Sequence, residues 1–178
     1  MTDFNTRGPR ARYTISFIAA VIVALIFLFA GVGKLADLGA MPGQTEYLDK
    51  MIPDFLLTPE LARFIGLVFI PWLLPIAEIV LGLLLLSGFW PRIWAIAVML
   101  LTASFMYNNV WMISQGIDKY PECACFGIWE TMLGQVSPAV SLGIDIFMFA
   151  LMAVVIFVLP GRFLASQFWI PLLGKKRS

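Results

Sequence analysis

The sequence contains no histidine, and this absence excludes several kinds of chemistry at once. Histidine is a common ligand of haem and zinc, and it is the usual base that activates serine or cysteine nucleophiles. A histidine-ligated haem, a typical zinc site and a Ser-His or Cys-His catalytic pair are therefore ruled out. A glycine-rich phosphate-binding loop is also missing, because the glycines fall in apolar runs and turns. The sequence thus disfavours a conventional hydrolase and a nucleotide-driven transporter.

Charged residues are scarce as well. They make up 13 % of the 178 residues, whereas 61 % are hydrophobic. Soluble domains have about 25 % charged and about 45–50 % apolar residues, so this composition predicts an integral membrane protein that contacts the lipid bilayer. The net charge is +1, and no basic patch with interleaved aromatic residues is present. We therefore predict no nucleic-acid partner.

Cysteine occurs only twice, at Cys123 and Cys125. A disulfide between them would close a small, strained ring, and strain makes a disulfide easier to reduce. A structural bridge usually joins distant segments, since closing a long loop is what removes unfolded-state entropy. We therefore favour a redox or partner-exchange role for the pair; the alternative is an inert pair, or a bridge that stiffens the turn before Gly127. Two thiols alone do not complete a four-ligand metal site, so no metal is predicted.

Four apolar runs are long enough to cross a bilayer, at residues 15–34, 64–86, 93–111 and 139–159. A spanning helix needs roughly 20 such residues. The first run is too long for the apolar region of a signal peptide and lacks a small-residue cleavage pattern. A short connection between the second and third runs makes them antiparallel neighbours. The fold class predicted is all-α, a single antiparallel bundle of four transmembrane helices over residues 14–160.

The basic residues predict the orientation of this bundle. Eight of the twelve lie in the N-terminal segment, in the turn after the second run and near the C-terminus. By the positive-inside rule both termini are cytoplasmic, with residues 1–13 as an N-terminal tail. Residues 161–178 are expected to form a basic tail at the inner interface, or equally a helix that contacts a partner subunit. The loop with Cys123 and Cys125 then faces the periplasm of a bacterial inner membrane, where thiols can cycle with disulfides.

Three charged residues fall within or at the ends of the apolar runs: Lys34, Glu78 and Asp145. A charge at this depth is costly, so Glu78 should face the bundle and find a partner. We consider Arg92 or a freed backbone carbonyl as that partner, and a proton or quinone role as the alternative. Lys34 and Asp145 lie at comparable depths, and we expect an ion pair between them that holds the first and fourth helices together.

Several local patterns predict helix ends and helix contacts. Thr58 and Ser137 each precede a proline, which is typical of a helix start. Small residues near the end of the first run predict a close helix contact; these are Ala30, Gly31 and Gly33. Prolines inside the second run are expected to bend it, at Pro71 and Pro75. An aromatic and amide cluster is interpreted as an interfacial belt, at Tyr107, Asn108, Asn109 and Trp111.

Three motifs together carry a family resemblance. They are Gly31-Val32-Gly33-Lys34-Leu35, Pro75-Ile76-Ala77-Glu78 and Cys123-Ala124-Cys125-Phe126-Gly127. Over about residues 14–160 the chain resembles the MauE branch of the DoxX-like membrane proteins. The first two motifs are shared widely among DoxX-like chains, and the cysteine motif is the more specific one.

The resemblance implies a four-helix membrane bundle that handles thiols and disulfides in the periplasm. In methylamine utilisation such a protein assists maturation of a disulfide-rich dehydrogenase alongside a thioredoxin-like partner. By this resemblance Cys123 and Cys125 are the catalytic redox pair, and a quinone is the candidate cofactor. Membrane proteins of the epoxide-reductase type use two cysteine pairs, however, and this chain has one. A complete relay to quinone would therefore use this pair directly or depend on another chain.

Two functions follow from the sequence. In the first, the chain is a component of a thiol–disulfide oxidoreductase that works with a periplasmic thioredoxin-like protein. In the alternative, it is a non-catalytic accessory subunit of a larger membrane oxidoreductase or respiratory complex. The cysteines would then form a fixed bridge, and Lys34, Glu78 and Asp145 would only hold the bundle together.

Overall fold

The computed structural model of the chain describes residues 7–36, 58–117, 127–129, 134 and 136–159. The two cysteines, most of both predicted loops and the predicted C-terminal tail lie outside these residues. Of the predicted N-terminal tail, residues 7–13 are described, and they form the first part of the first helix. Within the described part all regular structure is helical. The elements are α1 (Arg7–Ala36), α3 (Pro59–Phe64), η1 (Ile65–Leu73), α4 (Leu74–Ser87), α5 (Pro91–Ser114) and α7 (Pro138–Val158).

Four helical stretches of the described residues are long and apolar enough to cross a membrane. They are Ala11–Ala36, Pro59–Ser87, Pro91–Ser114 and Pro138–Val158. The second comprises α3, η1 and α4 in direct succession. Each of the four predicted apolar runs falls on one of these stretches. The prediction of an all-α membrane protein with four transmembrane helices is therefore confirmed.

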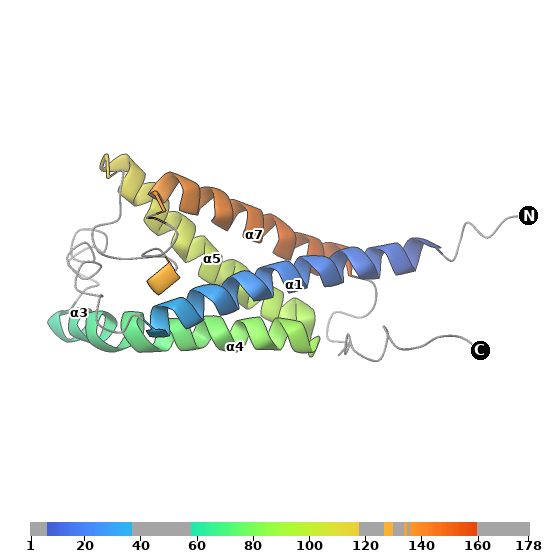
Figure 1. Cartoon of the computed structure of the whole chain (residues 1–178), viewed down its shortest axis with the longest axis horizontal. Helices are drawn as coiled ribbons and strands as arrows, with labels where there is room; N and C mark the ends of the chain where they lie inside the picture. The colour runs from blue at the N-terminus through green and yellow to red at the C-terminus, as the bar shows by residue number, and fades with distance from the viewer. Residues whose placement is uncertain (1–6, 37–57, 118–126, 130–133, 135, 160–178) are drawn as a thin grey trace, which may run out of the picture.

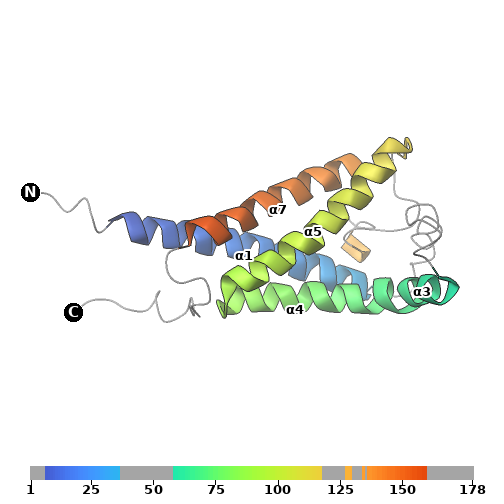
Figure 2. The ribbon, with the colours of Figure 1, turned by 180° about the vertical axis from the view of Figure 1, so that it is seen from behind.

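Successive spanning helices run in opposite directions, so α1 begins and α7 ends at the same end of the bundle (Figures 1 and 2). We call this the terminal end, and the opposite end, where α1 and α5 finish, the distal end. Helix α1 packs against α4 and α7, and α5 packs mainly against α7. In both views the short segment 127–129 lies beside the distal end of α1.

Side chains of small and medium size fill the space between the helices. Buried apolar residues of α1 recur with helical spacing and meet one or more residues from each of the other three spans. The members with the least exposure are Val23, Ala24, Leu85, Ala95, Val98, Met152 and Val155. Many large apolar side chains point outward instead, such as Leu100 and Phe157, which are 69 % and 81 % exposed. An outward apolar surface of this kind suits contact with lipid.

Two glycines allow α1 and α4 to lie unusually close together. A Cβ atom added at Gly31 would lie 2.8 Å from the carbonyl oxygen of Pro75, and one at Gly82 would lie 3.0 Å from that of Ala24. Backbones can approach this closely only where no side chain intervenes. The close contact predicted from the small residues near the end of α1 is thus present, and its partner is α4.

The predicted helix starts are confirmed. The hydroxyl of Thr58 accepts a hydrogen bond from the backbone N–H of Leu61, and that of Ser137 accepts one from Val140, both at 3.3 Å. In each case the following proline occupies a position whose N–H would have no partner within the helix. At the end of α4 a left-handed Gly88, with φ of 70°, reverses the chain toward α5.

The prolines of the second span produce a change of helix type. Pro71 lies inside η1, a nine-residue π-helix. Directly after η1, the backbone N–H of Leu74 bonds to the carbonyl of Phe69, five residues earlier, which is the spacing of a π-helix. A proline ring clashes with the carbonyl four residues earlier in an α-helix. The wider π-helix relieves this conflict. Pro75 is the second residue of α4, which continues η1 without a break.

Candidate functional site

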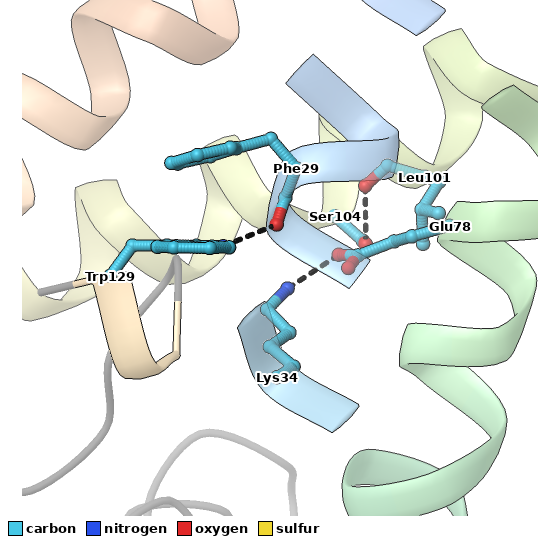
Figure 3. A network of polar contacts seen from close by, with 6 residues as sticks. All are labelled: Phe29, Lys34, Glu78, Leu101, Ser104 and Trp129. Atoms are coloured by element: carbon cyan, nitrogen blue, oxygen red, sulfur yellow. Dashed lines mark hydrogen bonds and ion pairs between the residues drawn. The ribbon is translucent and has the colours of Figure 1, made fainter. Parts of the chain in front are cut away.

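The ion pair between Lys34 and Glu78 is the centre of a polar cluster in the distal half of the bundle. The Nζ atom of Lys34, in the last turn of α1, lies 2.5 Å from Oε1 of Glu78 on α4 (Figure 3). Their side chains are 10 % and 2 % exposed. Gly31 makes this contact possible, because a Cβ there would lie only 3.3 Å from the Cβ of Glu78. The pair therefore depends on the close approach of α1 and α4.

Two of the pairings expected from the sequence are wrong. Glu78 does not pair with Arg92, whose guanidinium donates to the backbone carbonyl of Leu159 at the terminal end. Lys34 pairs with Glu78 and not with Asp145. The physical reason is the helix arrangement. Helix α1 lies closest to α4 where the glycines permit it, whereas Arg92 is the second residue of α5, beyond the turn that follows α4.

Asp145 has a neutral hydrogen-bond donor as its partner. The side-chain amide of Asn109 on α5 donates to Oδ2 of Asp145 on α7 at 2.7 Å, and to the hydroxyl of Ser141 at 3.1 Å. All three side chains are buried, with 5 % exposure or less. These bonds join α5 to α7, as the ion pair joins α1 to α4.

Asn109 is thus a site residue that the sequence analysis placed wrongly in the interfacial belt. Tyr107 does lie outward and is 60 % exposed. Asn109 follows the buried residues Val98 and Thr102 at spacings of eleven and seven residues, which keep it on the same helix face. This helical periodicity is the sequence signal that identifies Asn109 as buried. It is a better guide to the position of Asn109 than the neighbouring aromatic residues.

Lys34 and Glu78 make further contacts that define the cluster. The Nζ atom of Lys34 lies 5.2 Å from the ring centroid of Phe105 on α5, within the range of a cation–π interaction. The second oxygen of Glu78, Oε2, is buried and has no hydrogen-bond partner among the described residues. The charges of both residues also act on Asp145. The cluster therefore involves all four spanning helices.

The segment that follows the cysteine motif is fixed to the distal end of α1. The indole N–H of Trp129 donates to the backbone carbonyl of Phe29 at 3.0 Å, and the two rings stack with centroids 4.7 Å apart (Figure 3). Gly127 has φ of 59°, and a Cβ added to it would overlap the backbone of Gly33 and Lys34. Only glycine fits here without displacing α1. No local pattern in the sequence identifies a contact between residues one hundred positions apart.

The structure places the predicted site residues in two groups. Lys34, Glu78 and Asp145 all lie in the buried cluster, in pairings different from those expected. Cys123 and Cys125 lie outside the described residues. Within the described ranges, no group of three or more acidic, cysteine or histidine side chains could hold a metal ion.

The fold and the cluster define a class: a polytopic membrane protein of four spanning helices with an ion pair and a carboxyl–amide contact buried between them. Comparison with known families is consistent with this class. The sequence profile described as methylamine utilisation protein MauE matches residues 12–159, and the chain belongs to this family. The resemblance inferred from the three motifs is confirmed. Searches of curated proteins and of solved structures found no match.

Proposed function

We propose that this MauE-family chain exchanges thiols and disulfides through Cys123 and Cys125 on the periplasmic side of a bacterial inner membrane. Its partner is a thioredoxin-like protein, and the exchange aids maturation of exported proteins. Membership of the family and four apolar spans fit an accessory role in a membrane. The family's description as a methylamine utilisation protein supports a role in making one or more proteins of such a pathway.

The observation that carries this proposal is the attachment of residues 127–129 to α1. Cys125 precedes Gly127 by two residues, and two residues of extended chain span at most about 7 Å. Gly127, the last residue of the cysteine motif, contacts the backbone at the distal end of α1. This attachment supports a role for the motif at the distal end of the bundle, where a partner outside the membrane can approach.

The exchange needs only the partner as co-reactant. A thiolate of the pair attacks one sulfur of the partner's disulfide, which forms a mixed disulfide and releases the partner's other sulfur as a thiolate. The second cysteine then attacks the mixed disulfide. The products are an intrachain disulfide and a fully reduced partner, so two electrons have passed to the partner. The reverse sequence oxidises the partner.

The test is to trap the mixed disulfide. Cys123→Ser and Cys125→Ser are expressed separately, free thiols are alkylated in native membranes, and covalent adducts are identified by mass spectrometry after non-reducing electrophoresis. One of the two variants should accumulate an adduct with a thioredoxin-like protein that reductant removes. The double serine variant is the control and should yield none. If neither single variant traps such a protein, the exchange proposal fails.

A structural role is the second candidate, and the polar contacts favour it. The Lys34–Glu78 and Asn109–Asp145 contacts join helices in pairs without requiring a ligand. In this case the chain is an accessory subunit of a larger membrane oxidoreductase or respiratory complex, and the cysteines form a fixed bridge. A fully oxidised, reductant-resistant pair in a stoichiometric complex would support it, as would normal assembly of the double serine variant.

A further inference from the structure

The buried cluster contains more acidic groups than basic ones. Lys34 on α1 supplies one ammonium group, while Glu78 on α4 and Asp145 on α7 supply two carboxyl groups. Helix α5 contributes Phe105 and Asn109, which carry no charge. The docked residues 127–129 carry none either, and Arg92 is bonded at the terminal end. Among the described residues, one carboxyl group therefore has no cation to balance it.

We propose that this cluster is a proton-binding site, in which Asp145 holds one proton while Lys34 and Glu78 form the ion pair. An ionised carboxyl group buried in apolar surroundings without a counter-ion costs far more free energy than a neutral one. Binding a proton is the way in which such a group avoids that cost. The inference goes beyond the proposed thiol exchange and does not depend on the cysteines.

The geometry assigns the proton to Asp145 and not to Glu78. Glu78 lies 2.5 Å from the ammonium group of Lys34, a contact that stabilises its ionised form. Asp145 instead accepts a hydrogen bond from the neutral amide of Asn109, at 2.7 Å. The site therefore takes one proton per chain.

Charge balance leads to a counting rule that distinguishes a proton site from a purely structural cluster. The number of protonated carboxyl groups equals the number of carboxyl groups minus the number of cations. The wild-type cluster should hold one. Asp145→Asn should hold none, because Glu78 remains paired with Lys34. Glu78→Gln should also hold none, because Asp145 then becomes the counter-ion of Lys34. Lys34→Met should hold two.

Infrared difference spectroscopy of the full-length protein in liposomes at neutral pH measures these numbers. A protonated carboxyl group shows a C=O stretching band that a carboxylate lacks. Relative to wild type, the band of the cluster should be lost in Asp145→Asn and in Glu78→Gln, and should double in Lys34→Met. Glu60→Gln, which removes an exposed acid at the start of α3, should leave the band of the protonated carboxyl group unchanged. Serine at both cysteines should also leave it unchanged, which separates this test from that of thiol exchange.

The result that overturns the proposal is equally specific. If Asp145→Asn removes no protonated carboxyl band, Asp145 is ionised and the site holds no proton there. If the band is lost in Asp145→Asn but unchanged in Glu78→Gln, the two acids are not coupled through Lys34 and the shared site is refuted. Both are near-isosteric changes, so they decide the question even if Lys34→Met fails to fold.

Discussion

Replacing Gly31 by alanine tests whether the close approach of α1 and α4 holds the cluster together. The new Cβ would lie 2.8 Å from both the Pro75 carbonyl oxygen and Cγ1 of Ile79. Ordinary contacts begin at 3.4 Å, so the helices must separate locally by about 0.6 Å or distort. Gly143 is the matched control, because it lies inside α7 and a Cβ there meets nothing within 4 Å.

Gly31→Ala and Gly143→Ala have the same effect on helix propensity but differ in the packing around the new methyl group. Alanine in place of glycine inside a helix stabilises by about 0.5–1 kcal/mol at either position. At Gly31 overpacking costs about 1–3 kcal/mol in addition, since the obstructing atom is backbone and cannot rotate away. We therefore expect Gly143→Ala to be neutral or stabilising. Gly31→Ala should be less stable than Gly143→Ala by about 1–3 kcal/mol.

Unfolding of the purified protein in mixed micelles, followed by tryptophan fluorescence as the denaturing detergent is increased, measures this difference. Amide hydrogen exchange adds a local readout, because separation of the helices should accelerate exchange around Lys34 and Glu78 in the Gly31 variant alone. Equal stability of the two alanine variants, with unchanged exchange at these residues, would refute the argument that the glycine contact positions the ion pair.

Two further predictions concern the other contacts of the cluster. Gly127→Ala should release residues 127–129 from α1 and accelerate amide hydrogen exchange there. Gly116 is the control, because it has a similar φ of 72° but open space around it, so Gly116→Ala should not change exchange at residues 127–129. Equal exchange at these residues in both variants would contradict the docking. Asn109→Leu should destabilise by about 1–3 kcal/mol, because it removes the amide that donates to the buried carboxyl group of Asp145. Leucine at half-buried Asn108 should cost clearly less in the same unfolding assay, and an equal cost would count against the Asn109 bonds.

Much of the fold follows from local sequence. Apolar length predicts the four spans, and Thr58 and Ser137 with their following prolines predict two helix starts, because both depend on neighbouring residues only. The small residues at the end of α1 predict a close contact but do not name the partner helix. The Pro71 region shows the limit of such rules, since a bend and a change to π-helix are both ways of accommodating a proline.

The charged members of the site were predictable, but their pairings and the role of Asn109 were not. A charge in an apolar run is conspicuous, so Lys34, Glu78 and Asp145 stand out from sequence alone. Which charge meets which depends on how close each pair of helices lies, and that distance is set by Gly31 and Gly82 against backbone atoms of another helix. The attachment of Trp129 to Phe29 depends on a tertiary contact of the same kind, without a local signature.

The pairing of polar groups has a consequence for how the chain enters the membrane. Gly88 and Trp90 divide the sequence into two successive helical hairpins, α1 with α4 and α5 with α7, and each hairpin contains both members of its own polar contact. The first hairpin can therefore neutralise Lys34 with Glu78 before the second has been synthesised. We expect insertion to proceed hairpin by hairpin. Each buried charged side chain then has its polar partner in a helix of the same hairpin, so it does not depend on a helix that is synthesised later.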